Sequence, residues 1–373
     1  MDLAVKKALM NYRQKKIDCL NAKLDLDSVQ ENIETQLKNS LDQILKDLST
    51  QQQERVLAEI QQWGAIQSLS EDRMINEIII TSPSDIYYEK NGCWFRHADS
   101  FLDLESYDQF VERLAQQCCS HLCFERPFIE QKLNQFRLTV VFKHLGHGHH
   151  QISLRQQTES EWSLDKLQDL NWASPSEIQV LKKIIHHPSN WIVVGGTSSG
   201  KTTVLQALLD QIPHDQRLVV LEDTAELKSK SGLNTHLLTH YNSADPQKSV
   251  TLKDLLIRTL RLRPDRIVVG EIRGDEATQL LLALATGHVG SFGSLHARTA
   301  QEALLRLEML IQMGAPQWTS HTIRQLIRQT LHYIIVVKKE NGRRQLDGIY
   351  QISSLENNGF CLEKIENESE IKT

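Results

Sequence analysis

The chain has 373 residues, of which 40% are hydrophobic and 24% charged, and its formal net charge is −5. This composition is typical of a soluble globular protein, and the length predicts two or three domains. The acidic balance gives no reason to expect nucleic acid as a partner, and no apolar run approaches the roughly 18 residues of a membrane span. The N-terminus also lacks the apolar core of a signal peptide. We therefore expect a cytoplasmic protein whose contact with a membrane is peripheral.

Residues 1–70 are predicted to be a helical segment. Apolar residues recur there at intervals of three and four, at Val29, Ile33, Leu37, Leu41, Ile44 and Leu48. Thr50 and Gln53 fit a capping box, which predicts that a further helix begins near Thr50. We expect a small unit of packed helices, because the apolar pattern is too short for a coiled coil.

Residues 71–157 mix strand and helix patterns and are predicted to form a small α+β domain. Asn91 and Gly92 form a predicted hairpin turn between two strand-like runs. Two stretches, CCSHLC at 118–123 and HLGHGHH at 144–150, contain metal-ligating residue types. We expect idle cysteines at a helix end in the first and a hairpin loop in the second, because zinc-site spacing is lacking. The polar stretch QQTESEWS that follows is predicted to be a linker.

Residues 158–373 alternate between apolar strand patterns and amphipathic helix patterns. The predicted strands include WIVVGG, RLVVLED, DRIVVGE and VGSFGSLH. Alternation of this kind is typical of a mostly parallel sheet with helices on both faces. In such a domain ligands bind at the carboxyl ends of the strands. The polar side chains that follow these strands are therefore the candidate site.

The first strand end carries a phosphate-binding pattern. Gly195, Gly200, Lys201 and Thr202 fit G-x-x-x-x-G-K-[ST] between a buried strand and a helix. Glycines allow several backbone N–H groups to turn toward one anion, and the helix N-terminus adds its positive dipole end. Lys201 is expected to reach the β- and γ-phosphates, and the Thr202 hydroxyl to ligate Mg²⁺.

Polar side chains follow three other predicted strands. Glu222, Asp223 and Glu226 come directly after one of them, and Glu271 ends another. His296 lies at the end of a third. Carboxylates beside a phosphate-binding loop predict activation of a water molecule and ligation of a divalent metal ion.

In combination, these segments resemble the secretion ATPases of the type II/type IV secretion superfamily, which are RecA-like hexameric motors. GGTSSGKTT resembles their Walker A loop, LEDTAEL their aspartate box, LRLRPDRIVVGEIRG their Walker B segment and GHVGSFGSLHA their histidine box. The order and spacing agree over roughly residues 160–340. The helical N-terminal segment is most similar to that of the CpaF-like ATPases of tight-adherence (Tad) pili.

The resemblance implies a role for each matching residue. The phosphate loop consists of Gly195, Gly196, Thr197, Ser198, Ser199, Gly200, Lys201, Thr202 and Thr203. Glu271 takes the place of the catalytic glutamate, and Glu222, Asp223 and Glu226 form the aspartate box, which positions water and metal. Mg²⁺ is expected at Thr202 and Asp223, and His296 near the γ-phosphate.

Some residues match the family less closely. Arg137 and Arg155 of the first domain fall where the family directs arginines toward the nucleotide. Ser198 stands where glycine is common, Ser294 replaces a usual threonine, and Gly270 takes the Walker B aspartate position, as in some other family members. The acids and the lysine of the family's motifs are all present, so we expect an active enzyme.

The resemblance implies an ATP-hydrolysing homohexamer with Mg²⁺, peripheral at the inner membrane and working with a platform protein of a pilus or secretion apparatus. Two other functions stay open, a conjugative ATPase for DNA transfer and a nucleotide-binding assembly subunit with little turnover. Four arginines either belong to a solvated face or to intradomain ion pairs, or contact the nucleotide of a neighbouring subunit: Arg258, Arg261, Arg263 and Arg266.

Overall fold

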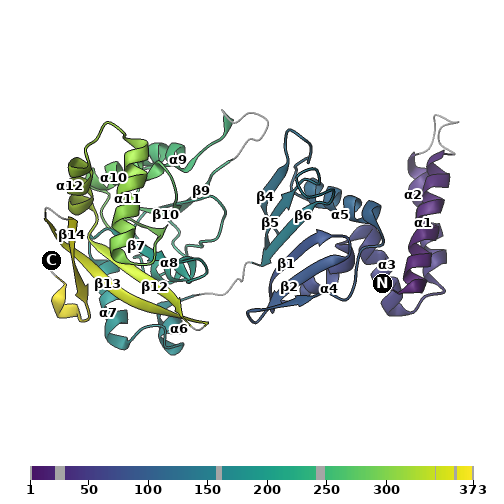
Figure 1. The fold of residues 1–373 in the computed structure, drawn as a ribbon, viewed down its shortest axis with the longest axis horizontal. Coiled ribbons are helices and arrows are strands. Elements are labelled where there is room, and N and C mark those ends of the chain that lie inside the picture. The colour runs from purple at the N-terminus through teal and green to yellow at the C-terminus, as the bar shows by residue number, and fades with distance from the viewer. Residues whose placement is uncertain are drawn as a thin grey trace. The chain divides into compact units, whose positions relative to one another are not determined.

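A computed structural model of the chain describes residues 2–21, 30–156, 162–240, 248–340, 342–356 and 359–371. The chain divides into two compact units, Met1–Glu159 and Ser160–Thr373, each of which contains its own sheet (Figure 1). Most of the predicted linker QQTESEWS falls on residues 157–161, which lie outside the described residues. The division of the first unit into domains at residues 1–70 and 71–157 stays a prediction.

The first unit begins with packed helices, as the apolar periodicity predicts. Val5 and Leu9 of the first helix are buried with Leu41 of the second and Val56 of the third. The helices of this segment are α1 (Leu3–Asn21), α2 (Gln30–Leu45), α3 (Thr50–Gln61), η2 (Gly64–Ile66) and α4 (Gln67–Glu71).

The capping box of α3 is displaced by one residue from the prediction. Ser49 and Gln52 form the box, in which the Gln52 amide N–H donates to the Ser49 hydroxyl and the Ser49 N–H to the Gln52 side chain. Gln53 instead donates to the carbonyls of Leu45 and Leu48, at 2.8 and 3.0 Å. The prediction of Thr50 and Gln53 was wrong because the Gln53 side chain donates to carbonyl groups at the end of α2 and in the turn that follows it.

A six-stranded antiparallel sheet with strand order β3-β2-β1-β6-β5-β4 forms the rest of the first unit. Phe110 and Leu114 of helix α5 (Leu104–Gln117) are buried with Ile78 and Leu138 of the sheet, so this helix covers one face. The strands are β1 (Ile75–Ser82), β2 (Asp85–Lys90), β3 (Cys93–Arg96), β4 (Phe128–Leu133), β5 (Phe136–Val141) and β6 (Gln151–Gln156).

Two predicted turns are present in this sheet. Asn91 and Gly92 join β2 to β3 with φ values of 53° and 80°, the left-handed conformation that a two-residue hairpin turn requires. The HLGHGHH stretch connects the paired strands β5 and β6 and is therefore a hairpin loop. The CCSHLC stretch follows the end of α5, where Cys118 is buried and Cys119 exposed.

The second unit is built on an eight-stranded sheet with strand order β14-β13-β12-β7-β11-β10-β8-β9. Strands β12 to β9 of this order pair in parallel, and β13 and β14 add an antiparallel edge. The strands are β7 (Trp191–Gly195), β8 (Leu218–Glu222), β9 (Asn234–Leu238), β10 (Arg266–Ile272), β11 (Phe292–His296), β12 (Tyr333–Glu340), β13 (Arg343–Glu356) and β14 (Gly359–Ile365).

Helices cover both faces of this sheet, as predicted. Alternate residues of β7 enter two different cores: Trp191 and Val193 pack with one set of helices, and Ile192 and Val194 with the other. The first set comprises α6 (Leu164–Asp169), α7 (Pro175–His186) and α8 (Lys201–Leu209). The second comprises α9 (Leu252–Thr259), α10 (Glu276–Ala285), α11 (Ala300–Gly314) and α12 (Ser320–Thr330). The described part of the unit also contains the 3₁₀ turns η4 (Leu260–Leu262) and η5 (Glu368–Glu370).

The parallel pairing decides where the functional groups lie. Because β7, β8, β10 and β11 are parallel neighbours, their carboxyl ends meet at one edge of the sheet. At the opposite edge the rings of Trp191 and Phe292 stack with centroids 4.0 Å apart. The residues of the second unit that are predicted to act on phosphate all lie at or just after these carboxyl ends.

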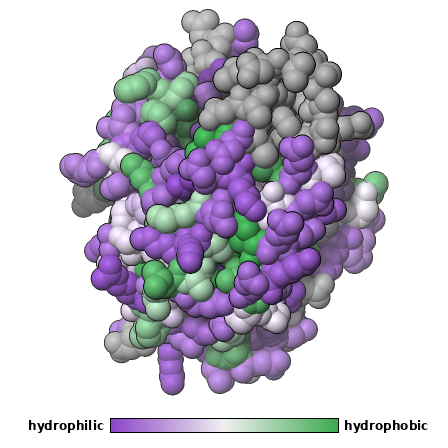
Figure 2. Space-filling view, turned by 90° about the vertical axis from the view of Figure 1, so that its right-hand side faces the viewer, coloured by the Kyte–Doolittle hydropathy of each residue, from purple (hydrophilic) through white to green (hydrophobic). Residues whose placement is uncertain are grey.

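The surface on the side of the N-terminal helices is mostly hydrophilic where it is coloured, and the apolar residues visible there lie in small areas among hydrophilic ones (Figure 2). Among the helices that the structure describes, none combines the length and the apolar character needed to cross a bilayer.

Candidate functional site

The glycine-rich segment between β7 and α8 forms an open loop. Gly200 precedes α8 with φ of 96° and provides no side-chain cap, so the first N–H groups of the helix stay available to a ligand. Gly195 must be glycine, because a Cβ atom there would lie 2.6 Å from the Val337 carbonyl oxygen. Ser199 donates a hydrogen bond to the Gly196 carbonyl at 2.8 Å.

Ser198 lies in the left-handed region, with φ of 58°. This conformation costs a residue with a side chain roughly 1–2 kcal/mol. The backbone conformation therefore explains why glycine is common at this position in the family that the sequence resembles. Serine at this position carries some backbone strain.

Lys201 points back across the loop. Its ammonium donates to the carbonyls of Gly195 and Gly196, at 3.1 and 3.2 Å, and lies 3.3 Å from each ring nitrogen of His296. Burial lowers the pKa of Lys201, the nearby Glu271 carboxylate opposes that shift, and Arg273 adds to it. A phosphate group would supply the negative charge that these neutral carbonyls do not.

His296 connects Lys201 to the carboxylate of Glu271. The His296 Nε2 atom lies 3.0 Å from Glu271 Oε1. Burial and the neighbouring Lys201 charge lower the pKa of His296, so the imidazole is neutral near pH 7. The neutral ring thus lies in contact with the Lys201 ammonium on one side and the Glu271 carboxylate on the other.

Arg273 extends this cluster to the aspartate box. Its guanidinium contacts Glu271 Oε2 at 2.5 Å and lies 3.8 Å from Asp223. These contacts and the nearby Glu226 raise the pKa of Arg273, chiefly through the hydrogen bond to Glu271. The structure thus brings together Lys201, His296, Glu271 and Asp223, with Arg273 between the two carboxylates.

Glu222 has a different environment from the other two acids of its segment. It is buried, and its Oε1 atom accepts hydrogen bonds from the backbone N–H groups of Glu226 and Leu227, both at 3.0 Å. Asp223 and Glu226 are exposed. The carboxylate of Glu222 therefore fixes the fold of the segment, whereas Asp223 and Glu226 are accessible to a ligand.

The oxygen donors predicted for Mg²⁺ are the half-buried Thr202 at the start of α8 and the exposed Asp223. Within the described ranges, no group of three or more His, Cys, Asp or Glu residues is arranged to hold a metal ion by itself. Hydroxyl and carboxylate oxygens suit Mg²⁺, which takes most of its remaining ligands from phosphate groups and water. The donor set therefore fits a metal ion that arrives with a nucleotide.

Arg137 and Arg155 lie in the first unit. They face each other in register on β5 and β6, on the side of the sheet away from α5, because their neighbours Leu138 and Leu154 are buried in the core. Their predicted contact with a nucleotide stays a prediction.

Arg266 is a structural residue of the second unit. It is 3% exposed and donates to Gln216 at 2.6 Å and to the Ile185 carbonyl at 2.7 Å. It is therefore excluded as a contact to a neighbouring subunit. The other three arginines of its group, Arg258, Arg261 and Arg263, are exposed.

Three arginines at this edge were not assigned a role from the sequence: Arg273, Arg306 and Arg344. Arg306, on α11, contributes to the lowered pKa of both Lys201 and His296. The Arg344 Nε atom donates to the Ser198 carbonyl at 3.0 Å. Proximity to Glu271 in the sequence could have indicated Arg273, but no motif marks the other two.

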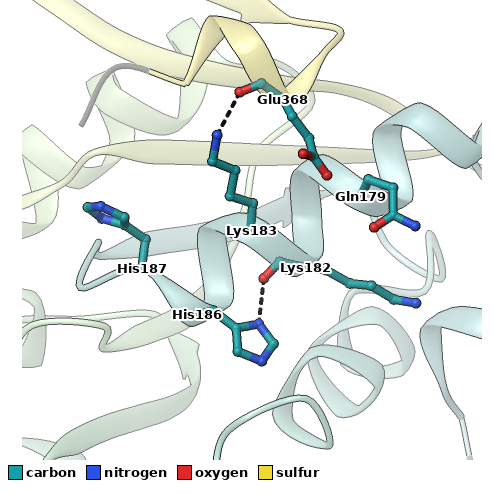
Figure 3. Close-up of a pocket in the computed structure, with 6 residues that line it drawn as sticks. All are labelled: Gln179, Lys182, Lys183, His186, His187 and Glu368. Atoms are coloured by element: carbon teal, nitrogen blue, oxygen red, sulfur yellow. Dashed lines mark hydrogen bonds between the residues drawn. The ribbon is translucent and has the colours of Figure 1, made fainter.

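A pocket of about 330 Å³ lies elsewhere on the second unit (Figure 3), lined by Gln179, Lys182, Lys183, His186, His187 and Glu368. It is formed by α7, whose end leads into the start of β7, and therefore lies toward the edge opposite the phosphate loop. Lys183 donates to the Glu368 carbonyl at 2.9 Å and so holds the turn η5 against α7. This pocket takes no part in the candidate phosphate site.

Solved structures with the same arrangement include the pilus retraction motor PilT with bound ADP. That match has a TM-score of 0.55 and 20% identity, and covers 76% of this chain and 81% of the other. The Legionella pneumophila ATPase DotB matches with a TM-score of 0.53 and 18% identity, over 76% and 78% of the two chains. The fold and the loop thus define a phosphate-loop protein with a RecA-like domain, which confirms the predicted fold class.

The family model described as "Type II/IV secretion system protein" matches residues 59–344. The conjugal transfer protein TrbB of Rhizobium radiobacter is 31% identical, over 81% of this chain and 92% of TrbB. The type IV secretion system protein PtlH of Bordetella pertussis (strain Tohama I) is 28% identical, over 72% and 87% of the two chains. The chain belongs to the type II/IV secretion system protein family.

Proposed function

We propose that the chain hydrolyses ATP to ADP and phosphate and that this reaction drives a secretion or pilus-assembly apparatus. The observation that carries the proposal is the contact between the phosphate-loop lysine and a carboxylate through one histidine, Lys201–His296–Glu271. A lysine that can bind the phosphates and a carboxylate that can orient a water molecule thus lie close enough to contact the same nucleotide. Phosphoryl transfer to water needs this arrangement.

The contacts of the phosphate loop without nucleotide indicate which of them change when nucleotide binds. Lys201 leaves the carbonyls of Gly195 and Gly196 and moves its charge to the β- and γ-phosphates, while the N–H groups of residues 196–203 surround the same anion. His296, which contacts that lysine, then lies next to the γ-phosphate. Binding therefore changes the contacts of the same histidine that holds Glu271.

Glu271 is the residue proposed to orient the attacking water. It is partly exposed, its Oε2 atom accepts a hydrogen bond from Arg273, and its Oε1 atom lies 3.0 Å from the His296 ring. Glu222 acts indirectly, because its buried carboxylate holds the segment that carries Asp223 and Glu226. Thr202 and Asp223 are proposed to hold Mg²⁺, which supplies charge stabilisation of the phosphate oxygens when bound.

We further propose that the active form is a homohexamer of the CpaF-like, tight-adherence type. In it, Arg137 and Arg155 of one chain reach the nucleotide of a neighbour, and the ring is peripheral to the cytoplasmic side of the inner membrane, where it acts on a platform protein. Negative charge builds up on the phosphate oxygens during transfer, so the site needs positive charge in addition to that of Lys201. Arginines from a neighbouring chain would supply it, and this requirement supports the model.

A second candidate is an ATPase for conjugative DNA transfer. Its support is the 31% identity with TrbB, which is named as a conjugal transfer protein. A third candidate is an assembly subunit that binds nucleotide with little turnover. The presence of all the acids of the family's motifs argues against it.

Release of phosphate from Mg²⁺-ATP by the purified chain tests these functions. We expect steady phosphate release that stops when EDTA is added and that does not change with DNA. Stimulation by DNA would favour the conjugative candidate, and tight ATP binding without phosphate release would favour the assembly subunit. A chain that binds no nucleotide would refute all three.

A further inference from the structure

The hairpin of β12 and β13 extends past the end of β7. Strand β7 pairs with β12 up to Gly195, which lies opposite Val337. Strand β12 then continues to Glu340, and β13 begins at Arg343 (Figure 1). Because a strand rises about 3.3 Å per residue, the end of the hairpin lies beside the phosphate loop rather than beside β7.

Arg344 of this hairpin contacts the loop directly. Its Nε atom donates to the Ser198 carbonyl at 3.0 Å, and its Cδ atom would lie 3.2 Å from a Cβ atom on Gly200. The side chain therefore contacts the loop around its two positive-φ residues. The guanidinium is exposed, and its Nη groups remain available as donors.

Lys339 lies directly opposite Arg344 in the hairpin register. Two like charges opposite each other destabilise a sheet unless an anion shares them. The other lysine of the strand, Lys338, is paired with Asp347 at 2.8 Å. Among the described residues no carboxylate forms an ion pair with Lys339 or Arg344, so the hairpin presents two uncompensated cations beside the loop.

These cations lie on the other side of β7 from the acids. In the sheet order, β12 flanks β7 on one side, and β11 and β10 lie on the other. His296 and Glu271 belong to β11 and β10, so the γ-phosphate is expected on their side. The opposite side of the loop, toward β12, is left for the ribose end of the nucleotide.

We propose that Arg344 and Lys339 form a phosphate subsite for the ribose end of the nucleotide, where ADP and ATP are identical. This inference rests on the proposed nucleotide-binding function. Arg344 connects the subsite to the loop through Ser198, and its Nη groups donate to the phosphate nearest the ribose. Lys339 adds a second positive charge. The subsite binds nucleotide without taking part in the transfer of the γ-phosphate.

The test compares binding of ADP and ATP to the full chain by isothermal titration calorimetry in the presence of EDTA, which prevents turnover. We expect Arg344→Ala to weaken the affinity for both nucleotides by the same factor, about tenfold or more. Lys339→Ala should weaken both by a smaller factor. Arg343→Ala is the matched control, because strand alternation places Arg343 on the opposite face from Arg344.

Two further variants distinguish a binding contact from a structural brace of the loop. Arg344→Gln keeps a neutral donor for the Ser198 carbonyl but loses the charge, and we expect it to bind as weakly as Arg344→Ala. Arg344→Lys keeps the charge and should recover part of the affinity. Recovery by glutamine, but not by lysine, would overturn the proposal in favour of a brace. The glutamine and lysine variants also decide the matter if Arg344→Ala fails to fold.

The remaining outcomes are equally decisive. An Arg344→Ala chain that binds ADP as tightly as the Arg343→Ala control would overturn the subsite while leaving the proposed function intact. A loss confined to ATP would place Arg344 at the γ-phosphate and also overturn it. A wild-type chain that binds neither nucleotide would refute the proposed function, and the subsite with it.

Discussion

A Cβ atom on Gly270 would lie 2.9 Å from the Cγ atom of Glu222. The two residues lie at the ends of neighbouring parallel strands, β10 and β8, and the glycine leaves the space that the glutamate side chain occupies. An aspartate at position 270 is incompatible with Glu222 in its observed place. The departure from the usual Walker B aspartate is thus coupled to the aspartate box.

Gly270→Ala is expected to destabilise the chain by about 1–3 kcal/mol, as overpacking of a filled site does. It should also lower turnover, because displacement of Glu222 releases the backbone of Glu226 and Leu227. Urea unfolding and a phosphate-release assay measure the two effects. Gly232→Ala is the control, since a Cβ atom there has nothing within 4 Å. Equal stability of the two variants would show that Glu222 moves aside at no cost.

Lys201→Ala is expected to abolish ATP binding while changing the free energy of unfolding by no more than about 1 kcal/mol. In the free chain its ammonium is bonded only to carbonyl oxygens and near His296, and burial already disfavours the charge. Calorimetric titration with ATP and a thermal melt of the same sample provide both values. Wild-type affinity in this variant would remove the phosphate-loop assignment.

Glu271→Gln should keep ATP binding and lose most of the hydrolysis, by roughly 10²-fold or more, because the amide keeps the shape but not the basicity. The comparison is with Glu226→Gln, which changes an exposed acid of the neighbouring segment. If Glu226→Gln abolishes hydrolysis and Glu271→Gln does not, the wrong carboxylate has been assigned.

The ring model predicts complementation between two inactive chains. A Lys201→Ala chain mixed with an Arg137→Ala or Arg155→Ala chain should recover part of the ATPase activity, because some junctions then combine an intact lysine with an intact arginine. Activity per chain is measured across mixing ratios and protein concentrations. No recovery, together with a rate per chain that does not depend on concentration, would contradict a shared active site.

The pH dependence of stability is expected to include a contribution from His332. Its Nδ1 atom accepts the backbone N–H of Asn190 at 3.0 Å, which requires an unprotonated nitrogen, and burial lowers its pKa from the ordinary 6.5. Its contribution is therefore complete above pH 6.5 and is lost as the pH falls through the lower folded-state pKa. His332→Asn, which keeps an acceptor, should lose less stability between pH 7.5 and 5.5 in urea unfolding. An unchanged slope would contradict this.

Local patterns predicted the centre of the fold well. The run from Trp191 to Leu209 contains a buried strand, a glycine loop and a helix, and each is decided by nearby residues. The capping box was placed one residue late because the sequence STQQQE offers two similar boxes. The carbonyls of Leu45 and Leu48, which lie outside that stretch, bind the Gln53 side chain and leave Gln52 for the box.

Other features depend on residues distant in the sequence. The strands β4 and β9 and the hairpin of β12 and β13 were not singled out, although they complete the two sheets. Arg344 meets Ser198 only because β12 pairs with β7. Similarly, the arginine-rich run before β10 gave no sign that Arg266 alone points into the interior.

Strand β7 is hydrogen-bonded to β11 on one edge and to β12 on the other, along its whole length from Trp191 to Gly195. A force that pulls on the phosphate loop along this strand loads both ladders in shear, so their bonds must break together. The loop therefore serves as a mechanical anchor. The segment after β8 is held by individual hydrogen bonds instead, among them those to the Glu222 carboxylate and those between Gln206 and the Lys228 backbone, and is therefore more compliant. In a motor built on this sheet, the stroke would begin in that compliant segment, while β7 stays still.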